Sequence, residues 1–196
     1  MFVASTPPKT LTKAEQTRLL RIVARHGSPR DLALLSLALG TGLRLRELVG
    51  LNVGHVAPNS REVAWKVDLP RNLTKGGRGG VAFLSQRVRL ELRRYLAWKA
   101  REGDPLAVNA PLFLSNQGRR ISLRRVQFIF IRWQREAGFE QIYSFHALRH
   151  SAITNVYRAT KDLFLAQRFA RHASPLTTAS YTHPSDEELF SKIGRI

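Results

Sequence analysis

The sequence of 196 residues contains no cysteine and only 14 acidic residues. Without cysteine the chain can form no disulfide, no cysteine nucleophile and no thiolate zinc site, and this composition fits a reducing compartment. Nucleases and polymerases that use two metal ions need clusters of carboxylates to hold their cations. The one tight acidic cluster, residues 186–188, lies where a helix is predicted to begin. We therefore expect no metal site.

Long apolar segments are also lacking. No run approaches the roughly 18 apolar residues of a membrane span. The N-terminal residues 1–8 lack the charged and apolar regions of a signal peptide. No glycine-rich nucleotide loop is present. The sequence therefore predicts a cytoplasmic protein without a membrane partner and without a cofactor.

Positive charge is in large excess. Lys and Arg together number 32, which gives a formal net charge of +18. A protein this basic attracts polyanions, and nucleic acid is the first partner to consider. Apolar residues make up 43% and charged residues 23%, which is typical of a globular chain of one sizeable domain. We therefore expect a folded protein that binds DNA.

The hydrophobic pattern predicts a mainly α fold with a small antiparallel β-sheet. Residues 1–11 are interpreted as a short lead and residues 12–196 as one domain. Two alternating segments, 63–67 and 81–84, predict strands on either side of the glycine-rich turn 74–80. Helical periodicity and capping residues predict helices over 12–25, 28–39, 45–51, 85–102, 122–137, 146–159, 162–170, 176–181 and 186–193.

Two segments in the first half of the chain carry groups that suit phosphate chemistry. Arg44 stands just after a glycine that interrupts a helical pattern. Lys75 lies among glycines in the predicted hairpin, where nothing beside it blocks a close approach to a phosphate. Taken alone, each is more often a solvated surface residue than a functional one.

The second half of the chain carries two further candidates. His146, Arg149 and His150 are spaced i, i+3 and i+4, which places them on one face of a helix. A zinc site at this histidine pair would lack a third ligand and a catalytic glutamate. His172 stands where a helix is predicted to end, and Tyr181 follows nine residues later.

Taken together and in this order, these segments resemble the catalytic domain of tyrosine recombinases, the phage-integrase family. The resemblance runs from about Leu11 to Ile193 and implies the catalytic-domain fold of that family. Four segments carry it in order: an arginine motif at 41–51, a lysine hairpin at 74–84, a His-x-x-Arg box at 144–150 and a final His…Tyr box at 169–183.

The resemblance implies a role for each catalytic candidate. Arg44 and Arg149 would clamp the scissile phosphate. Lys75 would be the general acid for the 5′-oxygen, and Tyr181 would be the nucleophile. His146 would act as an acid or base and as a phosphate ligand.

The same resemblance assigns three further positions. His172 would hydrogen-bond a non-bridging oxygen of the phosphate. Glu47 and His150 would be supporting residues that buttress the arginines and the packing of the site. The implied reaction is site-specific DNA recombination through a covalent 3′-phosphotyrosyl intermediate, without metal or ATP.

Elementary chemistry agrees with these roles. Attack on a phosphodiester builds negative charge on the equatorial oxygens, and guanidinium and imidazole donors can stabilise that charge without a metal. A phenol, whose reference pKa is about 10, needs such a positive setting to lose its proton. Basic residues on the helices at 86–102 and 123–137 would follow the DNA backbone.

Two departures from the family pattern stand out. The final box usually reads Leu-Gly-His, whereas this chain has Ala170, Arg171 and His172. Arg171 would contact DNA or alter how His172 is held. Most family members also carry an N-terminal DNA-binding domain that residues 1–11 cannot supply. The chain is therefore either a fragment or similar to small single-domain members such as the DNA invertases that switch fimbrial genes.

Two alternative functions stay open on the sequence. A type IB topoisomerase shares this chemistry, although such enzymes commonly carry lysine at the position of His146. A DNA-binding module that no longer cleaves is the other. The predicted C-terminal helix 186–193 carries an apolar stripe that either packs on its own domain or, as the resemblance implies, docks on a neighbouring protomer on double-stranded DNA in the nucleoid.

Overall fold

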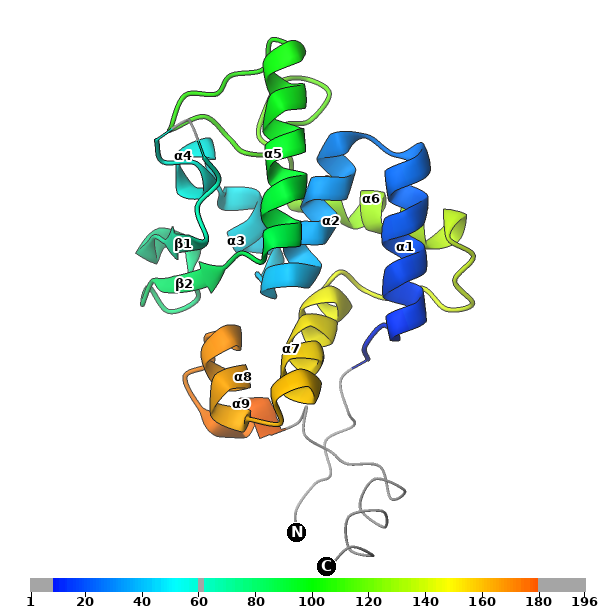
Figure 1. Ribbon diagram of the computed structural model, residues 1–196, viewed down its shortest axis with the longest axis vertical. Helices are drawn as coiled ribbons and strands as arrows, with labels where there is room; N and C mark the ends of the chain where they lie inside the picture. Colours follow the sequence, from blue (N-terminus) through cyan, green and yellow to red (C-terminus); the bar gives the residue numbers. More distant parts are fainter. Residues whose placement is uncertain (1–8, 60–61, 180–196) are drawn as a thin grey trace, which may run out of the picture.

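The computed structural model describes residues 9–59 and 62–179 (Figure 1). Its elements confirm the mainly helical class with a small antiparallel sheet. A 3₁₀ turn, η1 (Arg71–Leu73), lies between the strands β1 (Lys66–Leu69) and β2 (Gly80–Phe83). The helices of the described ranges are α1 (Lys13–His26), α2 (Pro29–Thr41), α3 (Leu45–Gly50), α4 (Val53–Val56), α5 (Gln86–Arg101), α6 (Leu123–Glu136), α7 (His146–Thr160), α8 (Leu163–Ala170) and α9 (Pro175–Ala179).

Capping residues set most helix boundaries close to where the sequence predicts them. Thr12 and Glu15 form a capping box at the start of α1. Ser28 caps α2 with Pro29 in its first turn. That helix continues two residues beyond the predicted end at residue 39, because Gly40 remains helical. The helix ends only at Gly42, which adopts left-handed backbone angles (φ 59°, ψ 26°).

The strands of the sheet differ from their prediction in extent. β1 begins at Lys66, not at residue 63, and pairs antiparallel with β2 from Lys66↔Phe83 to Leu69↔Gly80. The segment before Lys66 does not pair with β2. The Ala64 N–H donates instead to the carbonyl of Val56. Val56 belongs to α4, a single helical turn that the pattern does not predict. A turn this short carries too few residues to show a helical period.

The buried helix α2 lies at the centre of the fold and packs against α1, α5 and α7. Most of its side chains are buried, as expected for a helix that is apolar nearly all round. Leu11, the last residue of the predicted lead, is also part of this core. In Figure 1 the β-hairpin lies to one side of α5, and α7, α8 and α9 lie below it. No helix within 9–59 or 62–179 is long and apolar enough to cross a membrane.

A buried carboxylate joins α2 to α6. Asp31 accepts a hydrogen bond of 2.9 Å from the indole N–H of Trp133 and one of 3.1 Å from Nε of Arg30. Arg132 Nη2 lies 3.5 Å from the same carboxylate. Because Asp31 is 2% exposed, these three donors compensate for its loss of water.

Replacing Asp31 with alanine should lower the free energy of unfolding by about 3–5 kcal/mol, since a buried indole N–H and Arg30 lose their partner. Denaturant unfolding followed by circular dichroism measures this change. Glu136→Gln serves as the control, because it removes only an exposed ion pair with Arg132 and should change the same quantity by less than about 1 kcal/mol. Equal losses in the two variants would contradict a structural role for the buried carboxylate.

Candidate active site

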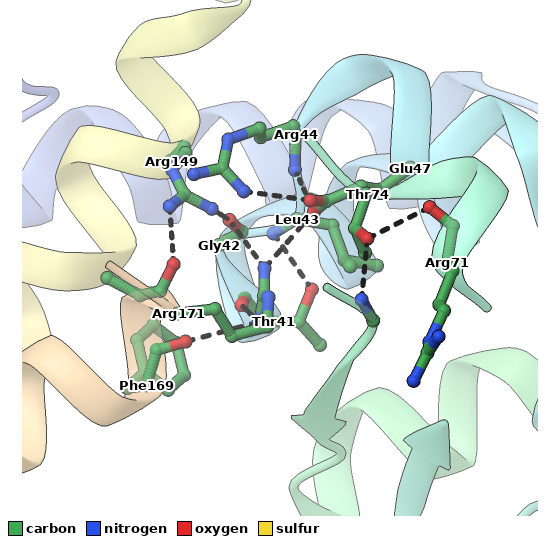
Figure 2. A network of polar contacts seen from close by, with 12 residues as sticks. Thr41, Gly42, Leu43, Arg44, Glu47, Arg71, Thr74, Arg149, Phe169 and Arg171 are labelled. Atoms are coloured by element: carbon green, nitrogen blue, oxygen red, sulfur yellow. Dashed lines mark hydrogen bonds and ion pairs between the residues drawn. The ribbon is translucent and has the colours of Figure 1, made fainter. Parts of the chain in front are cut away.

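The corner between α2 and α3 presents the first arginine. Gly42 ends α2, and Arg44 is the residue that immediately precedes α3. The backbone N–H of Arg44 donates to Oε2 of Glu47 at 2.8 Å, and its Nη1 donates to Oε1 at 2.9 Å (Figure 2). Glu47 is 1% exposed, so one buried carboxylate holds both the backbone and the guanidinium of Arg44.

The second arginine reaches the same corner from α7. Arg149 is buried, and its guanidinium donates to the carbonyls of Gly42 and Ala170 (Figure 2). Gly42 caps α2 and Ala170 is the last residue of α8. Carbonyls at helix C-termini carry partial negative charge and therefore favour a cation. Arg149 thus fastens the ends of two helices beside Arg44.

Three histidines surround this corner. The rings of His146 and His150 lie edge to face on α7, with centroids 4.6 Å apart. His172 follows the end of α8, and its Nδ1 lies 2.9 Å from the hydroxyl of Thr178 in α9. The hydroxyl partner was not predicted, because nothing in the sequence indicates that α9 folds back onto the histidine.

The surroundings of these three histidines favour the neutral form of each imidazole. Burial, together with the charges of Arg149 and Arg44, lowers the pKa of His146 and lowers that of His172 to about 4. Burial lowers the pKa of His150 to about 4 as well. The positive charge of the cluster therefore resides on its arginines, and the imidazoles can act as neutral donors and acceptors.

The glycine-rich turn brings Lys75 to a cavity shared with Arg44. The cavity holds about 400 Å³ and is also lined by Arg46 and Asn72. The Thr74 hydroxyl accepts from the N–H of Gly79 at 2.9 Å and so closes the turn. Lys75 itself is exposed to solvent.

The structure thus brings most of the predicted residues to one region. Arg44, Glu47 and Arg149 meet at the corner, and His146 and His150 lie on the same helix as Arg149. Lys75 reaches the site through the cavity that it shares with Arg44. Two predictions lie outside the described residues, namely the nucleophile Tyr181 and the C-terminal helix 186–193. Within the described ranges, no group of three His, Asp or Glu side chains is placed to hold a metal ion.

One member of the cluster was identified from the sequence only as a departure from the family pattern. Arg171 points inward, and its Nη2 lies 3.3 Å from Oε2 of Glu47 (Figure 2). The sequence shows a charged residue where the pattern has glycine, but it gives no sign of the direction in which that side chain points. Arg46 and Asn72 are likewise missed, because surface-exposed polar residues carry no pattern.

Comparison with known proteins places this arrangement in context. The family model described as "Phage integrase family" matches residues 9–188. The chain is similar to tyrosine recombinase XerC of Serratia marcescens, with 36% identity over 177 residues that make up 90% of this chain and 55% of the relative. The chain therefore spans about half the length of that curated relative.

Solved structures show the same fold. The crystal structure of XerA recombinase aligns with a TM-score of 0.79 and 25% identity, over 97% of this chain and 65% of that one. The structure of XerH site-specific recombinase bound to palindromic difH substrate aligns with a TM-score of 0.77 and 22% identity, over 96% of this chain and 53% of that one. With the family model matching nearly the whole chain, this protein belongs to the phage integrase family, whose members include the tyrosine recombinases.

Proposed function

We propose that the chain catalyses site-specific recombination of double-stranded DNA by cleaving and rejoining strands. The oxygen of Tyr181 forms a bond to the scissile phosphorus while the bond from phosphorus to the 5′-oxygen breaks. The 3′-phosphotyrosyl link is then attacked by the 5′-hydroxyl of a partner strand, which restores a phosphodiester and releases the tyrosine. The observation that carries this proposal is the convergence of Arg44 and Arg149, from separate helices, at one corner.

The two arginines supply what the reaction needs most. Negative charge grows on the non-bridging oxygens as the nucleophile approaches, and guanidinium donors held in place beforehand stabilise it. Arg149 is held by carbonyls and Arg44 by Glu47, so neither has to be ordered when DNA binds. His146 and His172, both neutral, add hydrogen bonds to the phosphate without further charge.

Lys75 is proposed to protonate the departing 5′-oxygen. A leaving alkoxide is a strong base, so a positioned ammonium that donates a proton lowers the barrier to breaking the bond. The lysine lies on the glycine-rich turn and lines the cavity that also contains Arg44. The cavity shared with Arg44 supports the proposal that Lys75 acts as this acid.

The surface supports duplex DNA as substrate. Exposed arginines on two helices would follow the phosphate backbone. They are Arg87, Arg93, Arg94 and Arg101 on α5 and Arg124, Arg125, Arg132 and Arg135 on α6. Two basic residues of α5 are excluded from this role, because Lys99 is buried beside Asp104 and Nε of Arg89 donates to the carbonyl of Val63.

Other protomers on DNA are the second proposed partner. The apolar stripe of Leu189, Phe190 and Ile193 in the predicted helix 186–193 would dock on a neighbouring copy. That segment follows Tyr181 closely, so docking would couple the nucleophile of one protomer to its neighbour. Because the proposed substrate is double-stranded DNA, we also propose that the protein acts on chromosomal DNA in the cytoplasm, at the nucleoid.

Replacing Tyr181 with phenylalanine should abolish the covalent adduct and leave DNA affinity within about twofold, because phosphate contacts dominate binding. A binding site is first selected from a random duplex library, and a nick is then placed beside the cleavage point so that the cleaved end is lost. Denaturing gels measure the adduct, and mobility shifts measure affinity. Tyr157→Phe, on α7, is the matched control and should form adduct normally.

Three outcomes are informative. Adduct in the Tyr181→Phe variant would remove this residue from its role. Absence of adduct in the parent protein with its selected site would favour a binding module that does not cleave. Relaxation of supercoiled plasmid without strand transfer between two sites would favour topoisomerase activity.

Replacing Lys75 with alanine should slow cleavage by roughly 10²–10⁴-fold, the usual scale for a general acid. A substrate with sulfur at the 5′-bridging position has a leaving group that needs little protonation, and the variant should cleave it nearly as fast as the parent does. Lys66→Ala is the control, because it removes the same charge from the neighbouring strand β1. An equal defect on the sulfur substrate would make Lys75 a binding residue.

A further inference from the structure

Arg171 occupies a backbone position that ordinarily suits glycine. It caps the C-terminus of α8 with φ 55° and ψ 43°, in the left-handed region, immediately before His172. A side chain with a Cβ is disfavoured there, and glycine is the usual residue at such a helix end. An arginine at this position indicates that its side chain does something that glycine could not.

The side chain of Arg171 turns into the protein instead of toward solvent. Its Nη1 donates to the carbonyl of Phe169 at 3.1 Å, and its Nη2 donates to the carbonyl of Gly42 at 3.3 Å. The same Nη2 lies 3.3 Å from Oε2 of Glu47, the carboxylate that holds Arg44 (Figure 2). One buried carboxylate therefore receives two guanidiniums from opposite sides.

The aliphatic part of Arg171 also touches the lysine hairpin. A Cβ added to Gly80, the first residue of β2, would lie 2.9 Å from Cδ of Arg171. The hairpin that carries Lys75 can approach this closely only because residue 80 has no side chain. Arg171 is thus in contact with the base of the hairpin, with the partner of Arg44, and with the helix end that precedes His172.

The sharing of Glu47 changes the charge that faces the cavity. A single arginine paired with Glu47 would form a neutral pair, whereas Arg44, Arg171 and Glu47 together keep one net positive charge. Burial lowers the pKa of Arg171, and the adjacent Glu47 opposes that effect. The Nε–H of Arg171 is buried without a hydrogen-bond partner among the described residues. A buried unpaired donor and a disfavoured backbone are both costs, and their coincidence at one residue points to function.

We propose that Arg171 is a positioning residue for strand cleavage: by sharing Glu47 it leaves Arg44 with uncompensated positive charge toward the scissile phosphate, and it holds the lysine hairpin against the end of α8. This inference rests on the cleavage activity proposed above. Arg171 itself contacts no DNA in this scheme, since its guanidinium is enclosed by protein groups.

The test compares substitutions of Arg171 in the full chain on the selected nicked duplex. Arg171→Gly suits the backbone and should fold, with DNA affinity within about threefold of the parent. Its single-turnover rate of adduct formation should fall roughly 10–100-fold, as expected when reacting groups lose alignment. Arg171→Lys keeps the charge and should recover much of that rate. Arg168→Gln, an exposed residue of the same helix, controls for loss of charge and should cleave normally.

A second substitution separates charge sharing from simple packing. In the Arg171→Gly variant, the negative charge of Glu47 is paired only with Arg44. Adding Glu47→Gln removes that negative charge. Because glutamine keeps an oxygen that can accept from Arg44 while losing the negative charge, the double variant should cleave faster than Arg171→Gly by several-fold. If Arg171 only filled space, losing a second buried partner would slow the reaction further. Gly80→Ala provides an independent probe, because it displaces the Arg171 stem without removing any charge, and it should slow cleavage with little change in affinity.

The outcomes distinguish this inference from the proposed function. A parent protein that forms no adduct overturns the cleavage activity itself. A parent that forms adduct, with an Arg171→Gly variant that is equally fast, overturns the positioning role alone. Unfolding of Arg171→Gly, detected by circular dichroism, would assign the residue to folding and would also overturn it. An Arg171→Gly variant whose entire defect is in DNA affinity would make Arg171 a DNA contact.

Discussion

The buried carboxylate of Glu47 is the interaction on which the arrangement of the site depends. It lies in the first turn of α3, accepts from the backbone and guanidinium of Arg44, and is also reached by Arg171 from the end of α8. A carboxylate that is 1% exposed would be very unfavourable without such partners. Its burial therefore requires the corner after Gly42 and the end of α8 to come together. Because His172 follows the end of α8, the burial of Glu47 also brings His172 close to Arg44 and Arg149.

The surrounding fold holds the corner after Gly42 and the end of α8 rigidly in place. The ends of α2 and α8 are fastened by Arg149, which donates to a carbonyl at each. Because α2 is itself buried between α1, α5 and α7, its C-terminal corner cannot shift without disturbing the core. Chemistry on a phosphodiester gains from such rigidity, because the donors are already oriented before charge develops. Lys75, by contrast, lies on an exposed turn outside this packed corner.

Helices could be predicted wherever the sequence shows a helical hydrophobic period or a capping residue. Thr12 and Ser28 are good predictors because their side chains satisfy free N–H groups at helix starts. The start of β1 could not be predicted, because Ala64 donates to the carbonyl of Val56 instead of joining the strand, and α4 was missed because a single turn shows no helical period. Likewise Arg44 and Arg149 were identified through the four motifs that resemble the family, whereas the inward direction of the Arg171 side chain depends on tertiary contacts that no motif shows.

The charge state of the cluster follows from the same contacts. Arginine keeps its proton even when buried, so burying several guanidiniums makes the region positive at any physiological pH. That positive field, with burial, lowers the pKa of His172 to about 4 and that of His146 in the same direction. In the proposed reaction, a phosphate bound between Arg44 and Arg149 would offset part of that field and so raise the pKa values of these histidines again. In that reaction the arginines would attract the phosphate and, together with burial, favour neutral imidazoles before it binds.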